Sequence, residues 1–206
     1  SEERIGRCLP NLSKRPLIST KVGKLVRPGV REGTELFGDR QPFYLANLDK
    51  RFIFDFSYDG VLRSHEESLQ RLGVDAVDIL HIHDPDEHFT DAVQGAYRSL
   101  NRLREEGSIK AVSAGMNQWE MLSKFLDHGD FDCFLLAGRY TLLDQSSLAE
   151  LLPKCLKHGT SIVIGGVYNS GILANPVPGT TYNYVEAPQD MIDRALAMDV
   201  ICQRHG

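Results

Sequence analysis

The chain has 206 residues, of which 42% are hydrophobic and 25% are charged, and its formal net charge is −5. This is an ordinary globular composition, with enough chain for one sizeable core. The acidic balance and the lack of a Lys/Arg block argue against a nucleic-acid or anionic-membrane surface, and no apolar run is long enough to span a membrane.

The order of patterns along the chain predicts alternating helices and strands. Residues 1–9 have an amphipathic helical pattern, and five short apolar runs predict strands. These strands are Leu17–Val22, Val77–Ile82, Ile109–Gly115, Phe131–Ala137 and Ser161–Gly165. The segment 30–51 contains Gly and Pro without a period, which predicts a loop, and 51–57 alternates phenylalanines as an edge strand would.

Further helices are predicted at 64–73, 91–107, 120–129 and 147–159, with a final helix over 187–206. Ser64 with Glu67, and Ser147 with Glu150, have the spacing of a capping box, so we expect the two serines to begin their helices. Pro153 is expected to bend its helix, because proline lacks the backbone donor of a helix interior.

The alternation of nearly continuous apolar strands with helices predicts an α/β fold with a parallel sheet. No Gly-x-Gly-x-x-Gly follows any strand, which weakens a Rossmann interpretation. Polar or small residues instead follow the strands, as at the catalytic rim of a (β/α)8 TIM barrel. Because such a barrel has eight strands and about 250 residues, we expect 1–206 to be a single but incomplete barrel domain.

The run "HIH" raises three alternatives for His81 and His83, which share one face of their strand. His81 can be a hydrogen-bonded residue that faces the barrel interior. The pair can bind zinc, as in barrel hydrolases, but His128, His158 and His205 precede glycines at helix ends and do not complete a ligand set. His83 can act alone as an acid–base group, with Lys21 as its partner across the rim.

Several segments in order resemble the aldo-keto reductase family, in its branch of sugar and pyridoxal dehydrogenases. They are "LISTKVG", "DFSYDGVLRSHEESLQRLGVDAVDILHIHDPD", "IKAVSAGMN", "AGRYTLL" and "VIGGVYNSGIL". The resemblance implies that Lys21 and His83 are catalytic residues. It also implies that the family's catalytic Asp and Tyr, its first two strands and its eighth strand lie outside this sequence.

The resemblance further implies NAD or NADP as cofactor. Asn117 matches the residue that holds the nicotinamide carboxamide, and Tyr168, Asn169, Ser170 and Gly171 match the loop over the pyrophosphate. Ala137 stands near the position where the family often has a helping Gln. Gly165 or Gly166 stands where a ring usually stacks on the nicotinamide.

The expected function is therefore an NAD(P)-dependent oxidoreductase acting on a small carbonyl or sugar substrate, such as an aldose oxidised at its anomeric carbon. The alternatives are an inactive fragment or binding subunit of the same fold, and a metal-dependent barrel hydrolase using His81 and His83. The scattered cysteines, without a Cys-x-x-Cys spacing, indicate reduced, buried thiols in a cytoplasmic protein.

Overall fold

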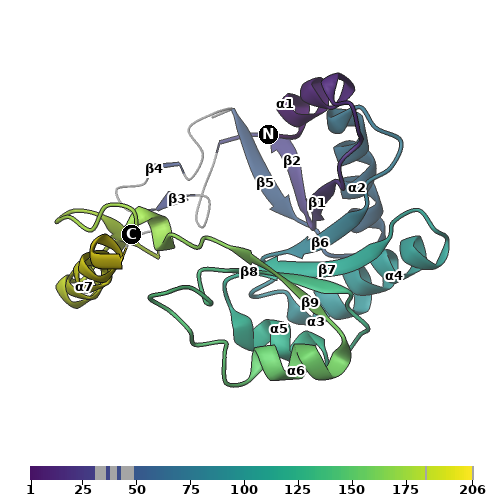
Figure 1. Cartoon of the computed structure of the whole chain (residues 1–206). Coiled ribbons are helices and arrows are strands. Elements are labelled where there is room, and N and C mark those ends of the chain that lie inside the picture. The colour runs from purple at the N-terminus through teal and green to yellow at the C-terminus, as the bar shows by residue number, and fades with distance from the viewer. Residues whose placement is uncertain (31–35, 38–40, 43–48, 184, 206) are drawn as a thin grey trace.

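A computed structural model describes residues 1–30, 36–37, 41–42, 49–183 and 185–205, and its centre is a five-stranded parallel sheet (Figure 1). The sheet order is β1-β6-β7-β8-β9, so each strand pairs with the next one of the sheet along the chain. The strands are β1 Ser19–Val22, β6 Ile79–His83, β7 Ala111–Met116, β8 Cys133–Ala137 and β9 Ser161–Gly165. All five predicted strands are confirmed, within a few residues at their ends.

Helices cover one face of this sheet (Figure 1). They are α2 Tyr58–Leu72, the continuous run of α3 Phe89–Asp91, the π-helical η3 Ala92–Tyr97 and α4 Arg98–Glu105, then α5 Trp119–Phe125 and α6 Leu151–His158. The predicted N-terminal helix is α1 Glu2–Cys8, which packs on α2 and continues into the 3-10 turn η1 Leu9–Asn11. The sheet and helices thus form the two layers expected of barrel βα units.

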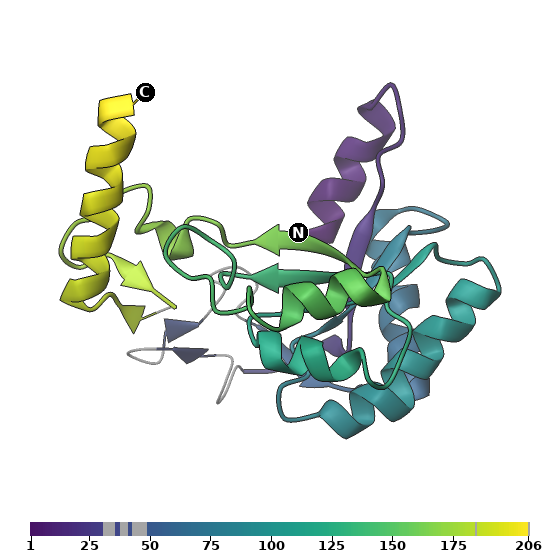
Figure 2. The ribbon, with the colours of Figure 1, turned by 60° about the horizontal axis from the view of Figure 1, so that its bottom comes forward.

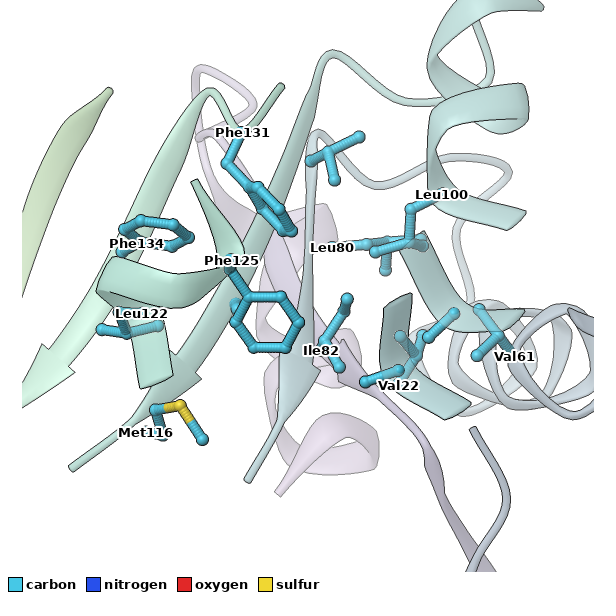
Figure 3. Packing of buried hydrophobic residues seen from close by; sticks show 14 of the residues in the cluster. Val22, Val61, Leu80, Ile82, Leu100, Met116, Leu122, Phe125, Phe131 and Phe134 are labelled. Atoms are coloured by element: carbon cyan, nitrogen blue, oxygen red, sulfur yellow. The ribbon is translucent and has the colours of Figure 1, made fainter. Parts of the chain in front are cut away.

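The main core lies between the sheet and these helices (Figure 3). Alternate strand residues such as Leu80, Ile82, Phe134 and Leu136 are fully buried there. The residues between them point to the other face of the sheet, because side chains alternate along a strand. That second face carries Lys21 and both histidines of β6. These polar residues therefore lie on the side of the sheet opposite the main apolar core.

An antiparallel hairpin precedes α2 and overlaps the predicted loop only at Lys50 and Arg51. Its strands are β2 Lys24–Pro28 and β5 Lys50–Phe54, and Lys24 pairs with Phe54. The prediction of a strand in 51–57 is therefore confirmed, while its partner β2 was not predicted. Within 30–51 the structure also pairs β3 Leu36–Phe37 with β4 Gln41–Pro42. The rest of that predicted loop, apart from Val30 and Asp49–Arg51, lies outside the described residues.

The prediction that Ser64 and Ser147 begin their helices is wrong. Helix α2 begins at Tyr58, where the Ser57 hydroxyl accepts a hydrogen bond from the Gly60 N–H, so Ser64 lies inside the helix. Helix α6 begins at Leu151, and the Ser147 hydroxyl instead donates to the carbonyl of Arg139. The expected bend at Pro153 is also wrong, because this residue lies in the first turn of α6, where the missing N–H costs little.

The C-terminal region forms a second, smaller apolar cluster. The predicted final helix is α7 Gln189–His205, preceded by η4 Asn169–Gly171 and the short pair β10 Thr181–Tyr182 and β11 Val185–Glu186. Figure 2 shows α7 at one end of the molecule, away from the helices that cover the sheet. Its buried residues, with Leu143 and Ile172, pack apart from the main core.

All four cysteines are free, but only two agree with the expectation of buried thiols. Cys133 and Cys155 are buried, whereas Cys8 and Cys202 are exposed on α1 and α7. Both helices bury little of their surface, because α1 has no buried residue and α7 buries only Ile192 and Ala195. No helix among the described residues has the length and apolar character needed to cross a membrane.

Candidate active site

Lys21 and His83 lie at the carboxyl ends of the neighbouring strands β1 and β6. The register pairs Lys21 with His81, two residues before His83, so all three side chains share one face of the sheet. The positive charge of Lys21 contributes to lowering the pKa of both histidines, which agrees with this proximity. The Lys21 side chain is exposed. The structure therefore brings the two predicted catalytic residues to one edge of the sheet.

His81 is a buried, hydrogen-bonded residue of the sheet. It is 4% exposed, and its Nδ1 lies 2.7 Å from the Ser113 hydroxyl of β7. Burial, followed by the charges of Lys21 and His83, lowers its pKa to about 4, so the ring is neutral at pH 7. This environment fits the first alternative for His81. The described residues contain no group of three or more His, Cys, Asp or Glu placed to hold a metal ion.

His83 has a carboxylate partner that the sequence reasoning missed. Its Nε2 lies 3.1 Å from Oδ2 of Asp84, and the same oxygen accepts from Nζ of Lys24 at 2.8 Å. Burial lowers the pKa of His83, and Lys24 and Lys21 add to this effect, while the Asp84 carboxylate opposes it. The sequence signal for this pair is the "HD" dipeptide at the strand end, but only the hairpin brings Lys24 to it.

A pocket of about 410 Å³ opens beside this network. Its walls come from the β2–β5 hairpin, from the loop after β6 and from the residues after β7. They are Lys24, Phe54, Asp84, Asp86, Glu87, His88, Asn117 and Gln118. The His88 ring stacks on Phe54 with their centroids 5.4 Å apart, which gives the pocket one aromatic wall among polar groups. Its size and mixed lining suit a small polar ligand.

Asn117 and Asn169 converge from two loops on the backbone after β8. The Asn117 Nδ2 donates to the Ala137 carbonyl at 2.9 Å, and the Asn169 Nδ2 donates to the Gly138 carbonyl at 3.2 Å. A Cβ added to Gly138 would lie 3.8 Å from each of these amide nitrogens. Two of the predicted cofactor residues, 52 positions apart in the sequence, are therefore close neighbours.

The predicted pyrophosphate loop has an unusual backbone. Asn169, Ser170 and Gly171 have φ angles of 47°, 60° and 99°, a left-handed run that few non-glycine residues adopt. Tyr168, just before them, is 63% exposed. Asn169 and Ser170 are therefore held in a strained conformation after β9, and Tyr168 presents its aromatic ring to solvent.

The residues present fit a nicotinamide dinucleotide. The Asn169 side chain is 4% exposed, and its Oδ1 is buried without a hydrogen-bond partner among the described residues. A buried acceptor of this kind is expected to find a donor, and a carboxamide N–H₂ is one. Close by, Tyr168 lines a second cavity of about 580 Å³ together with Tyr140, Val167 and residues of α7. The orphaned acceptor and the exposed aromatic ring together are consistent with a flat polar ligand.

Of the two glycines at the expected stacking position, Gly166 has a steric reason to lack a side chain, whereas a Cβ added to Gly165 would make only ordinary contacts, the nearest at 3.5 Å. Gly166 has a φ of 60°, and an added Cβ would lie 3.3 Å from the backbone nitrogen of Gly138. A larger residue there is disfavoured both by the backbone conformation and by this close approach. The aromatic residue nearest in the sequence to this glycine, Tyr168, lines the larger cavity together with Tyr140.

Comparison with known proteins identifies the family. The sequence model of the aldo/keto reductase family matches residues 1–206, and the chain belongs to this family. It is 39% identical to pyridoxal 4-dehydrogenase of Microbacterium luteolum, over 99% of this chain and 64% of that protein. It is 35% identical to D-threo-aldose 1-dehydrogenase of a Pseudomonas species, over 100% of this chain and 63% of that protein.

Solved structures support the barrel fold. The holo form of an aldo-keto reductase from Bacillus halodurans matches 89% of this chain and 54% of its own, with a TM-score of 0.64 and 20% identity. A glycerol dehydrogenase from Gluconobacter oxydans matches 92% of this chain and 50% of its own, with a TM-score of 0.60 and 20% identity. The chain thus has the α/β barrel fold of the family, and it spans a little under two thirds of the two curated relatives' length.

Proposed function

We propose that the protein containing this chain is an NAD(P)-dependent oxidoreductase. It acts on the carbonyl or hydroxyl carbon of a small polar substrate, such as an aldose oxidised at its anomeric carbon. Family membership and the two dehydrogenase relatives support this class of reaction. The observation that carries the proposal is that Lys21 and His83 lie at the same carboxyl edge of the sheet as the amide pair Asn117 and Asn169.

The residues of this edge have complementary roles in the proposed reaction. When bound, the nicotinamide accepts or supplies the hydride. His83 hydrogen-bonds the reacting oxygen, and the positive charge of Lys21 favours an ionised oxygen beside it. Asn117 and the Tyr168–Gly171 loop hold the cofactor, with the orphaned Oδ1 of Asn169 as an acceptor. The carboxylates of the 410 Å³ pocket accept hydrogen bonds from substrate hydroxyls, and the amide N–H₂ of Gln118 donates one to a substrate oxygen.

The assignment to a single barrel domain over 1–206 and to the cytoplasm belongs to the same proposal. The continuous core between the five-stranded sheet and its helices supports one domain for the part of the chain up to α6. The buried free thiols of Cys133 and Cys155 support a reducing compartment. The choice between NAD and NADP is left to the binding experiment.

Cofactor binding is tested by titrating the purified protein with NADH and NADPH and following the nicotinamide fluorescence. We expect saturable binding of at least one nucleotide. We expect Asn117→Ala to raise the Kd about tenfold, the cost of one lost hydrogen bond. Asn101→Ala is the matched control, because this asparagine bonds Glu105 on an exposed face of α4. No binding of either nucleotide, or an equal loss in the control, contradicts the proposal.

Catalysis is tested by following reduced cofactor with an aldose and with pyridoxal as substrates. We expect His83→Ala to lower kcat/KM at least about 100-fold, as removal of an acid–base group does, and Lys21→Met to lower it as well. Turnover that does not depend on these residues contradicts their roles. Cofactor binding without any turnover would instead favour a binding subunit of the same fold.

A further inference from the structure

Asp84 has a backbone conformation that turns its side chain back onto the preceding residue. Its φ is +42°, in the left-handed region, where non-glycine residues are uncommon and backbone strain accumulates at functional sites. Its N–H donates to the Gly115 carbonyl of β7 at 3.1 Å, which fixes the turn at the end of β6. As a result Oδ2 lies 3.1 Å from Nε2 of His83.

Lys24, on strand β2 of the hairpin, forms an ion pair with the Asp84 carboxylate. Lys24 Nζ lies 2.8 Å from the same Oδ2, and its side chain is only 17% exposed. The ammonium group also lies 5.4 Å from the centroid of the Phe54 ring, its cross-strand neighbour. Burial alone would raise the pKa of Asp84, but His83 and Lys24 lower it to about 2, so the carboxylate is ionised at neutral pH.

We propose that Asp84, held by Lys24, is a positioning residue that fixes the ring orientation and the protonated nitrogen of His83. An ionised carboxylate cannot donate, so the Nε2 that faces it carries the proton, and the neutral ring keeps its lone pair on Nδ1. The dyad thus presets which nitrogen of His83 can accept a proton or hydrogen bond from the substrate. This inference deepens the proposed function and rests on it for its catalytic consequence.

The other groups around His83 do not supply an alternative carboxylate among the described contacts. On β1, Lys21 lowers the pKa of His83, and Lys24 of β2 does the same. On its own strand His81 is neutral at pH 7, and on β7 the residue in register is Gly115, which carries no charge. Asp84 is therefore the anion whose removal should change the ring most.

The experiment is NMR of the histidine rings in the full chain labelled with ¹⁵N-histidine. Asp84→Asn removes the charge, and Asp84→Gly removes the side chain. Both residue types tolerate a positive φ, so the turn is preserved. Asp91→Asn is the matched control, because this exposed carboxylate lies 3.8 Å from His88 rather than beside His83. The His81 signals serve as an internal check that the sheet remains folded.

We expect a slowly exchanging Nε2–H signal for His83 in the wild type, lost in Asp84→Gly and retained in Asp91→Asn. The pKa of His83 should fall in Asp84→Asn, because a neighbouring negative charge that stabilises the imidazolium is gone. The corresponding limb of the pH–rate profile should move to lower pH. With the ring less well held, kcat should fall about 10- to 100-fold.

An unchanged His83 pKa in Asp84→Asn, together with an Nε2–H signal that survives in Asp84→Gly, would overturn the positioning role, even if turnover falls. The expected NMR changes can also be seen without any turnover. That outcome supports the positioning of His83 by Asp84 and counts against the proposed function. The two hypotheses therefore fail by different observations.

Discussion

At the scale of single residues, His81 and His83 show how two identical side chains on one strand acquire different properties. Their shared face follows from the two-residue spacing and was predicted. Their chemistry depends on neighbours that are distant in sequence. His81 is closed in beside Ser113, while the His83 side chain is 25% exposed and meets Asp84. The sequence pattern gives the direction of each ring, but the packing decides its protonation.

Asp78 forms a network of contacts at the amino ends of β1, β6 and β7, the edge of the sheet opposite the candidate site. Its side chain is 4% exposed, and its oxygens lie 2.9 Å from both Arg15 and Lys110. It also accepts the backbone N–H of Ile18 at 2.8 Å, just before β1 begins. One buried carboxylate thus links the segment leading into β1 to the residues that precede β7.

Asp78→Ala should destabilise the protein by about 1–3 kcal/mol, chiefly because it leaves the buried Ile18 N–H without its acceptor. Urea unfolding monitored by circular dichroism measures the loss. Asp75→Ala, a change at an exposed carboxylate of the same loop, is the control and should cost little. Equal losses in the two variants would show that the Asp78 network is not stabilising.

The Asp78 network also predicts a pH dependence of stability. Burial raises the pKa of Asp78, but the Ile18 N–H, Lys110 and Arg15 lower it to about 2, below its ordinary value of 3.8. A depressed folded-state pKa gives stability that is present above about pH 4 and is lost as the pH falls towards 2. In Asp78→Ala the free energy of unfolding should change less over this range. The same slope in both proteins would count against the assignment.

At the scale of elements, α2 shows the limit of local sequence patterns. Ser64 and Glu67 have capping-box spacing, yet the helix begins two turns earlier, at Ser57. The segment 58–63 is helical because α2, to which it belongs, packs against β1 and against the helical run of η3 and α4. Tertiary burial therefore extends a helix beyond the point at which a local pattern indicates its start.

Ser57→Ala should cost about 1 kcal/mol, since the hydroxyl that accepts the Gly60 N–H is the N-cap of α2. Ser64→Ala is the natural comparison, because alanine is the better helix former at an interior position. Thermal and urea unfolding of the two variants give the answer. A larger loss of unfolding free energy in Ser64→Ala than in Ser57→Ala would contradict this and would favour Ser64 as the N-cap.

The β2–β5 hairpin is the element that completes the candidate site. Its second strand was predicted from the alternating phenylalanines, but β2 was not, and neither was its placement across the carboxyl edge of the sheet. That placement brings Lys24 to Asp84 and Phe54 to His88. No spacing in the sequence signals these contacts, because Lys24 and Asp84 are 60 positions apart.

At the scale of the whole molecule, exposure divides the four cysteines into two classes. Cys8 and Cys202 are exposed on the terminal helices, whereas Cys133 and Cys155 are buried, Cys155 within the main core. Burial raises the pKa of both buried thiols, to about 11 for Cys155. Since the thiolate is the reactive form, the buried pair is protected both sterically and chemically.

A chromogenic thiol reagent should therefore modify two of the four cysteines quickly in the native protein, and all four in urea. The double variant Cys8→Ser/Cys202→Ser should leave no fast-reacting thiol, while its slow phase is kept. A fast thiol that persists in this variant would mean that Cys133 or Cys155 is accessible, and that the core is less closed than the structure indicates.

The sequence by itself determined the α/β class, the five strands and the positions of Lys21, His83 and Asn117 at strand ends, because apolar periodicity and residue spacing are local properties. The family, and with it the place of Asn169 in a cofactor loop, followed from the resemblance of several segments in order. The tertiary structure alone decided that Asp84 and Lys24 meet at His83, that two amides converge on Gly138, and which cysteines are exposed. These features depend on contacts between distant segments, which only packing brings together.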